Sequence, residues 1–222
     1  MKSIILIAPP AAGKGTQSKF IESEYNIPHI SIGDLLRNII ASGSELGKSL
    51  ENIINEGKLI NDEIIINLLK QRLINNDCSN GYILDGFPRN LNQAKAYEKI
   101  LDELNLSNSM VIYLDLDKDI ALKRILGRTM CPNCGLIYNE FFRETSPINT
   151  GLCDKCHKKL VKRSDDNLET FNKRYDTYYI ETKPLIDYYQ KKGILFIIDS
   201  NMNKEKVFNQ IKKVVEENND KY

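Results

Sequence analysis

The sequence has almost no excess charge of either sign. Its 222 residues include 31 lysines and arginines against 30 aspartates and glutamates, which gives a formal net charge of +1. Proteins that bind nucleic acid or an anionic membrane over a broad surface usually carry a clear positive excess. The balance argues against such a surface, so any anion that this protein binds must be held by a local site.

Long apolar runs are lacking as well. A helix that crosses a membrane needs about 20 consecutive, mostly apolar residues, and no run in the sequence approaches that length. Met1-Lys2-Ser3 leads directly into the apolar run 4–8, which is too short for the core of a secretory signal and has no small-residue cleavage site. We therefore expect a cytoplasmic protein.

Cysteine is scarce and its count is odd. A secreted disulfide framework usually has an even number of cysteines, whereas this chain has five. The pattern therefore favours a reducing compartment. Cys78 stands alone in the sequence, and we expect it to be a small, partly buried residue without a chemical role.

The other four cysteines form two C-x-x-C pairs. Cys131 and Cys134 are separated by 18 residues from Cys153 and Cys156, a spacing typical of a zinc site with four thiolate ligands. A site closed by four thiolates leaves no open coordination position, so we expect the zinc to be structural. Iron in the same site, or His157 in place of Cys156, are the alternatives.

The apolar pattern alternates short β-branched runs with longer amphipathic stretches, which is typical of an α/β fold with a parallel sheet. The expected strands are 3–8, 29–31, 82–85, 110–116 and 195–199. The expected helices are 14–25, 34–42, 47–56, 62–75, 91–104, 120–126, 167–183 and 204–217. Asn61 or Asp62 should cap the helix that follows, and Pro184 should interrupt the long helix or open a new one.

One segment breaks this alternation. Between about residues 129 and 160 the apolar period disappears, and the two cysteine pairs lie near its ends. A segment of this length without a core of its own needs a staple or is disordered. The sequence therefore predicts a small module held by a metal.

A phosphate-binding loop is predicted after the first strand. Residues 8–16 read A-P-P-A-A-G-K-G-T and lead into a helix, the context in which loop N–H groups, a helix N-terminus and a lysine surround phosphates. Two departures from the usual motif are Ala8 in place of its first glycine and Gly15 between Lys14 and Thr16. Ala8 fits only if its φ is negative or the turn is shifted.

Three segments, in order and spacing, resemble the adenylate kinase family of nucleoside monophosphate kinases. They are the loop 8–16, S-I-G-D-L-L-R at 31–37, and D-G-F-P-R at 85–89 followed by Gln93. The resemblance extends from Ile4 to about Val215. It implies a P-loop NTPase-like α/β fold, a five-stranded parallel sheet flanked by helices, with an inserted zinc-bearing lid over ATP.

The resemblance also implies how the chain is divided. We expect a single kinase domain over residues 1–222. Its core would comprise 1–30, 61–128 and 161–222, with a helical monophosphate-binding insert at 31–60 and a zinc lid at 129–160.

The activity implied is reversible phosphoryl transfer from ATP to AMP, dependent on Mg²⁺, which yields two ADP. Such a transfer relies on positioning and electrostatic stabilisation, for which the planar and permanently charged guanidinium of arginine is suited. By resemblance, the catalytic residues are Lys14, Arg89, Arg128, Arg163 and Arg174. The residues implied for ATP are Ala11, Ala12, Gly13, Lys14, Gly15, Thr16, Arg124, Arg128, Ile137, Tyr138 and Met202. Those implied for AMP are Ile32, Arg37, Lys58, Leu59, Ile60, Gly86, Phe87, Pro88, Arg89, Gln93, Arg163 and Arg174.

Acidic residues and histidines complete the expected site. The resemblance implies that Asp85 holds Mg²⁺ through water, and that Asp165 and Asp166 either orient arginines or cap the following helix. The chain has only two histidines, and an acceptor phosphate, already anionic, needs no general base. We expect His29, at the start of a strand, to be structural.

Ile32 departs from the resemblance, because the family commonly has a hydroxyl residue beside the monophosphate base. Ser31 would point the other way if the segment is extended, so preference for AMP would rest mainly on Gln93. The alternatives are a kinase for another monophosphate or with GTP as donor, and more remotely a zinc-ribbon nucleic-acid-binding module on an ATP switch. We expect a monomer whose partners are ATP, AMP and ADP, without nucleic acid or membrane.

Overall fold

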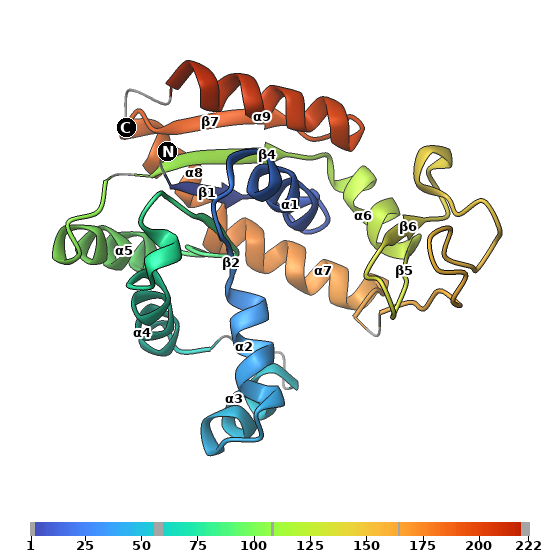
Figure 1. Ribbon diagram of the computed structural model, residues 1–222, viewed down its shortest axis with the longest axis horizontal. Helices are drawn as coiled ribbons and strands as arrows, with labels where there is room; N and C mark the ends of the chain where they lie inside the picture. Colours follow the sequence, from blue (N-terminus) through green and yellow to red (C-terminus); the bar gives the residue numbers. More distant parts are fainter. Residues whose placement is uncertain (1–2, 56–59, 108, 164, 219–222) are drawn as a thin grey trace.

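The computed structural model describes residues 3–55, 60–107, 109–163 and 165–218. A five-stranded parallel sheet forms the centre of the molecule, with strand order β2-β3-β1-β4-β7 (Figure 1). The strands are β1 (Ile4–Ile7), β2 (His29–Ser31), β3 (Ile83–Asp85), β4 (Met110–Asp115) and β7 (Leu195–Asp199). The five predicted strands are therefore confirmed, to within one residue at each end.

Helices cover both faces of the sheet, and β1 shows how the sequence sets this up. Ile5 and Ile7 pack on one face with residues of α4 (Asp62–Leu73), α5 (Leu91–Glu103) and α8 (Pro184–Lys191). Ile4 and Leu6 pack on the other with α1 (Lys14–Tyr25), α6 (Lys118–Leu126), α7 (Leu168–Thr177) and α9 (Lys204–Asn218). Successive side chains of a strand point to opposite faces, so an unbroken apolar run is what a sheet covered on both sides requires.

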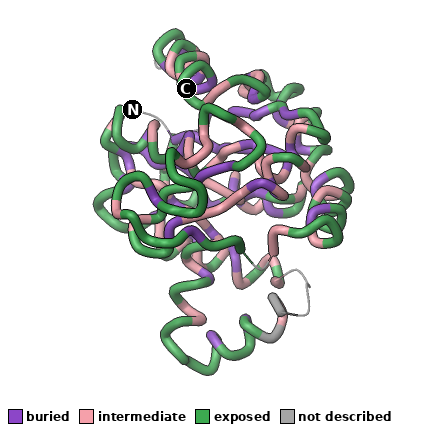
Figure 2. Tube along the Cα trace, turned by 90° about the vertical axis from the view of Figure 1, so that its right-hand side faces the viewer, coloured by how far each residue is buried: buried purple, intermediate pink, exposed green. Residues whose placement is uncertain are grey.

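Two further helices extend away from the sheet. The helices α2 (Ile32–Ala41) and α3 (Glu45–Asn55) form this projection, which Figure 1 shows at the bottom and Figure 2 shows to be mostly exposed. The Ser31 hydroxyl caps α2 by accepting a hydrogen bond from the Asp34 N–H at 3.3 Å. A Cβ on Gly47 would lie 2.4 Å from the Ile39 carbonyl oxygen, so only glycine allows the two helices to pack this closely.

The cysteine segment projects from another side of the sheet (Figure 1). It contains an antiparallel pair of strands, β5 (Arg128–Met130) and β6 (Ile137–Asn139), which the sequence pattern did not predict. Each strand has only three residues, too few to show a period. The segment is not wholly without a core, because Tyr138 and Leu160 are buried together with Cys131 and Cys153.

The long helix expected at 167–183 is divided. The helix α7 ends at Thr177, residues Tyr178–Thr182 form a π-helical turn, and α8 opens on Pro184. Proline is well suited to the first turn of a helix, because it has no N–H to leave unpaired there. Two short 3₁₀ helices, Asn76–Cys78 and Arg143–Thr145, complete the described elements.

Candidate active site

The predicted phosphate-binding loop lies between β1 and α1, at the edge of the sheet where the strands end. Ala8 keeps a negative φ, as its place in the motif requires. Left-handed backbone occurs instead at Ala11, with φ of 64°, and at Gly13, with φ of 89°. Gly13 immediately precedes α1, so the N-terminus of that helix opens on the loop.

Side chains from distant parts of the chain fix the shape of this loop. The Ser200 hydroxyl donates to the Ala12 carbonyl at 2.7 Å. The Arg124 guanidinium donates to the carbonyls of Ala11 (3.4 Å), Ser200 (2.9 Å) and Met202 (3.3 Å). The loop is thus tied to the segment that follows β7. Ser200 was not predicted as a site residue, although its place directly after a strand on this edge is a usable signal.

Lys14 lies among charges of both signs. Burial lowers the pKa of its ammonium group, the carboxylate of Asp85 opposes this effect, and the positive charges of Arg89 and Arg174 add to it. Lys14, Asp85, Arg89 and Arg174 therefore lie close enough to influence one another, as the sequence predicted for a site that holds phosphates.

Asp85 ends β3 at the same edge of the sheet, and His29 is its partner. The His29 Nε2 lies 3.3 Å from Asp85 Oδ2, and it donates a hydrogen bond because an ionised carboxylate can only accept one. Burial alone would raise the pKa of Asp85, but the His29 hydrogen bond and the charges of Lys14 and Arg89 outweigh it and lower the pKa. The sequence predicted a structural role for His29 and did not foresee this contact.

The loop after β3 presents Arg89. Gly86 has a φ of 78°, and its carbonyl accepts a hydrogen bond from Arg89 Nε at 3.0 Å. The Thr182 hydroxyl, in the π-helical turn, donates to the Arg89 carbonyl at 2.9 Å. Phe87 is buried in the core and anchors the loop, while Arg89 remains partly accessible to solvent beside Asp85 and Arg174.

The arginines near the cysteine segment are held by two neighbouring aspartates. Arg128 forms a bidentate ion pair with the fully buried carboxylate of Asp166, at 2.8 and 2.5 Å. Asp165 pairs with Arg163 at 3.0 Å and with Arg174 at 3.1 Å. The cap of α7 is Asn167, whose side chain accepts from the Thr170 N–H at 2.9 Å. Of the two roles considered for these aspartates, the structure supports the orientation of arginines.

The segment predicted to hold the monophosphate is more loosely assembled. Arg37 is exposed and pairs with Asp34 at 2.5 Å, so it lies outside the group around Lys14. Ile32 is buried, while Ile60 packs at the border of the core. The Gln93 side chain is buried and hydrogen-bonded at both ends. Lys58 and Leu59, also predicted for this site, lie outside the described residues, and Pro88 is buried beside Phe87.

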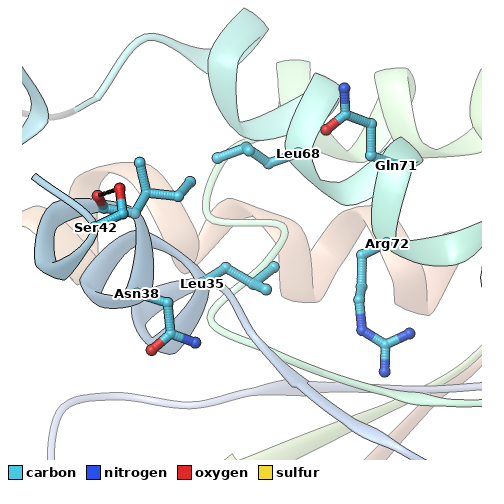
Figure 3. A pocket seen from close by; sticks show the side chains of 7 residues that line it. Leu35, Asn38, Ser42, Leu68, Gln71 and Arg72 are labelled. Carbon is cyan, nitrogen blue, oxygen red and sulfur yellow. Dashed lines mark hydrogen bonds between the residues drawn. The ribbon is translucent and has the colours of Figure 1, made fainter. Parts of the chain in front are cut away.

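A groove of about 430 Å³ separates α2 from α4. Figure 3 shows Leu35 and Leu68 extending into this space from the two helices, with Asn38 and Arg72 at its border. The insert of α2 and α3 therefore stands apart from the core on this side.

The four cysteines meet in the segment that contains β5 and β6. Their sulfur atoms all lie within 4.8 Å of one another, with Cys131 and Cys156 at 3.3 Å and Cys134 and Cys153 at 3.4 Å. A tetrahedral zinc with Zn–S bonds of about 2.3 Å needs sulfur–sulfur distances of about 3.8 Å, so the cluster fits this metal. Within the described residues the cluster consists of these four cysteines, and His157 is not part of it.

Tyr138 supports this cluster. Its side chain is buried against the cysteines, and its hydroxyl lies 3.5 Å from Cys153 Sγ while it accepts a hydrogen bond from the Asp154 N–H at 2.8 Å. Ile137 and Met202, predicted like Tyr138 to contact ATP, have exposed side chains. The ring of Tyr138 therefore packs against the four-cysteine cluster, whereas Ile137 and Met202 remain accessible to a ligand.

No helix in the described part of the chain is long and apolar enough to cross a membrane. The positions of the loop 8–16, Asp85 and Arg89 at the carboxyl edge of a parallel sheet define a P-loop α/β protein that handles phosphorylated nucleotides.

Comparison with known proteins gives the family. A family model described as "Adenylate kinase" matches residues 6–194. Proteins named "Adenylate kinase" are similar over 96% of this chain in Thermodesulfovibrio yellowstonii (43% identical, 98% of that protein covered) and in Archaeoglobus fulgidus (44% identical, 98% covered). Another from Caldanaerobacter subterraneus is 43% identical over 96% of this chain and 95% of its own length. The chain belongs to the adenylate kinase family, and it is therefore a nucleoside monophosphate kinase, an ATP:AMP phosphotransferase.

Proposed function

We propose that the protein transfers the γ-phosphoryl group of ATP to AMP in the presence of Mg²⁺, giving two ADP. The convergence of Lys14, Asp85, Arg89 and Arg174 at one edge of the sheet is the observation that carries this proposal. An oxygen of the AMP phosphate attacks the γ-phosphorus, and the bond from that phosphorus to the β–γ bridging oxygen breaks. Each nucleotide then leaves as ADP. The attacking oxygen carries no proton that must be removed, so no general base is needed.

The loop and Lys14 would bind the β- and γ-phosphates, and Asp85 would hold Mg²⁺ through water. The metal supplies charge neutralisation at the phosphate oxygens. Gly13, Gly15 and Thr16 line the loop with Ala11 and Ala12. Arg124 holds the loop by its hydrogen bonds to Ala11 and Met202, and Ile137, Met202 and the backbone at Tyr138 border the ATP base.

The AMP phosphate would be bound by Arg37 and Arg89, and Gln93 would read the base. Arg128, Arg163 and Arg174 would close on the transferring group. Their ion pairs with Asp165 and Asp166 support this role, because each guanidinium is already held at the junction between the lid and α7. Arg37 would have to exchange Asp34 for the phosphate.

The chain would be divided as the sequence suggests, into a core, a monophosphate-binding insert at 31–60 and a lid at 129–160. Zinc in the lid would be structural, because the four thiolates leave no open position for a substrate. We propose a cytoplasmic monomer whose partners are ATP, AMP and ADP, without nucleic acid or membrane. The near-zero net charge supports the absence of a nucleic-acid partner.

A coupled assay for ADP formation tests the reaction. The purified protein would be supplied with Mg²⁺ and ATP, or GTP as donor, together with AMP, CMP, UMP or GMP. We expect the highest kcat/KM with ATP and AMP. If ADP formation does not depend on AMP, the proposed reaction is wrong, and a preference for another monophosphate or for GTP would identify the alternative kinase.

A further inference from the structure

The carboxamide of Gln93 is held by two groups that can each bond only one of its ends. Gln93 Oε1 accepts from the Arg89 backbone N–H at 2.8 Å, and Gln93 Nε2 donates to Asp62 Oδ1 at 2.6 Å. A backbone N–H can only donate, and an ionised carboxylate can only accept. Rotation of the amide by 180° would therefore set two donors against each other and two acceptors against each other. The orientation of this amide is fixed by its partners.

Asp62 is well placed to act on Gln93. It is the first residue of α4, but the cap of that helix is Asn61, which accepts from the Glu63 N–H at 2.8 Å. The Asp62 carboxylate instead faces α5, where Asn90 Nδ2 lies 3.3 Å from its Oδ2. Asn90 in turn accepts from the Gln93 N–H at 2.8 Å. The Asp62 carboxylate thus joins the start of α4 to the start of α5 through Gln93 and Asn90.

The fixed amide keeps a defined hydrogen-bonding capacity for a ligand. A carboxamide offers two acceptor positions on oxygen and two N–H donors. Arg89 and Asp62 use one of each, which leaves one acceptor on Oε1 and one donor on Nε2 in a fixed order. A 6-aminopurine presents an amino donor beside a ring-nitrogen acceptor, whereas a 6-oxopurine presents an acceptor beside a ring N–H donor. A fixed amide matches only one of these orders, while an amide free to rotate can match either.

We propose that Asp62 determines the discrimination between 6-amino and 6-oxo purine monophosphates by fixing the orientation of Gln93. The inference rests on the proposed function, in which Gln93 reads the acceptor base. The neighbouring side chains at positions 31 and 32 offer the base no free hydrogen-bonding group, so discrimination would rest on the Gln93 amide. Ile32 has no hydrogen-bonding group, and the Ser31 hydroxyl is engaged in capping α2.

The test compares AMP with IMP, which differ in the base only by the exchange of the 6-amino group for a 6-oxo group. Asp62→Asn keeps the shape of the side chain but can both donate and accept, so that only the Arg89 N–H still opposes the rotated amide. We expect the ratio of kcat/KM for AMP to that for IMP to fall by about five- to tenfold, the size of one ordinary intramolecular hydrogen bond. The ratio should change mainly because kcat/KM for IMP rises, while kcat/KM for AMP changes less.

Glu63→Gln is the matched control. It removes one negative charge from the same helical turn, but the Glu63 side chain is exposed, so the AMP/IMP ratio should not change. In a Gln93→Ala background, Asp62→Asn should have no further effect on the ratio, because Asp62 acts only through Gln93. If Asp62→Asn still lowers the AMP/IMP ratio in the Gln93→Ala background, Asp62 does not act through Gln93, and the inference is overturned.

A spectroscopic readout on the unaltered protein does not depend on how the variants fold. One proton of the Gln93 side-chain NH₂ should be protected from exchange with water, and protection should decrease in Asp62→Asn. An unchanged AMP/IMP ratio in a folded Asp62→Asn protein, or free exchange of both NH₂ protons in the unaltered protein, would contradict the inference. Absence of AMP-dependent ADP formation in the unaltered protein would instead overturn the proposed function.

Discussion

The edge of the sheet and the cysteine segment are held together by different means. Around the phosphate-binding loop, residues such as Ile4, Leu6 and Leu84 are almost fully buried, and the loop itself is tied down by Arg124 and Ser200. Apart from Cys131 and Cys153, the apolar side chains buried in the described cysteine segment are those of Tyr138 and Leu160. We therefore expect the fold around the loop to persist without the cysteine segment, whereas the cysteine segment would depend on a metal held by its four cysteines.

The largest effect should come from the phosphate loop itself. Lys14→Met removes a charge that no other described side chain supplies from within the loop. We expect kcat/KM to fall by roughly 10²–10³-fold, the usual size for the loss of one electrostatic contact in a transition state. Zinc content and the melting temperature should stay close to those of the unaltered protein. An activity loss below tenfold would exclude Lys14 from the reaction.

Removal of a metal ligand should affect the other region. Cys131→Ala leaves three thiolates, which no longer close a tetrahedron. We expect loss of bound zinc, a lower melting temperature, and proteolytic cleavage within 129–160 before cleavage in the core. Metal analysis and limited proteolysis would measure this, with Cys78→Ala as a control that lies outside the cluster. Unchanged zinc content would show that the assignment is wrong.

The junction between the regions should be sensitive to its buried ion pair. Asp166→Ala would leave Arg128 largely buried without its bidentate partner, for which we expect a loss of about 3–5 kcal/mol in the free energy of unfolding. The control is Asp176→Ala, because Asp176 is an exposed aspartate on α7. Urea denaturation of both would test this, and equal small losses would contradict a structural role for the pair.

The pH dependence of stability should report on Asp85. Its pKa is lower in the folded chain than the ordinary value, so its contribution to stability is complete above the unfolded pKa of about 3.9 and is lost as the pH falls through the folded value. We expect the unfolding free energy to decrease more steeply below about pH 4 in the unaltered protein than in Asp85→Asn. If the unfolding free energies of the two proteins fall in parallel with pH, His29 and Lys14 do not stabilise the ionised Asp85 carboxylate.

The smallest effect should come from replacing Ile32, the residue that departs from the family pattern in the segment predicted to bind the monophosphate. Ile32→Thr restores a hydroxyl beside the base, and we expect preference for AMP over CMP and UMP to rise a few-fold, the size of one neutral hydrogen bond. Steady-state kinetics with the three acceptors would measure this. A decrease in preference would mean that the side chain at this position does not face the base.

The sequence predicted the features that follow from local pattern or fixed spacing. The five strands, the position of the loop 8–16 and the meeting of the four cysteines are confirmed. Each depends on a local property of the sequence: the period of the apolar residues, the position of the glycines, or the spacing of the cysteines. Two contacts between distant segments were not predicted. The pairing of His29 with Asp85 and the contact of Ser200 with Ala12 arise only when strands are brought together. The strands β5 and β6 escaped prediction because three residues are too few to show alternation.

The roles given to the arginines and to Gln93 came from resemblance rather than from pattern. An arginine in a sequence gives no sign of which anion it will meet. The structure adds the reason why these arginines are held in place, because Asp165 and Asp166 use their carboxylates as ion-pair partners while Asn167 caps the helix.

Phosphorus NMR of a single reaction mixture tests the central claim most directly. ATP and AMP would be incubated with the protein and Mg²⁺, and the phosphate signals followed until they stop changing. We predict that one ATP and one AMP disappear for every two ADP formed, with no inorganic phosphate, and that no reaction occurs without AMP or after Mg²⁺ is chelated. Release of inorganic phosphate from ATP in the absence of AMP, at a rate equal to that in its presence, would contradict the account.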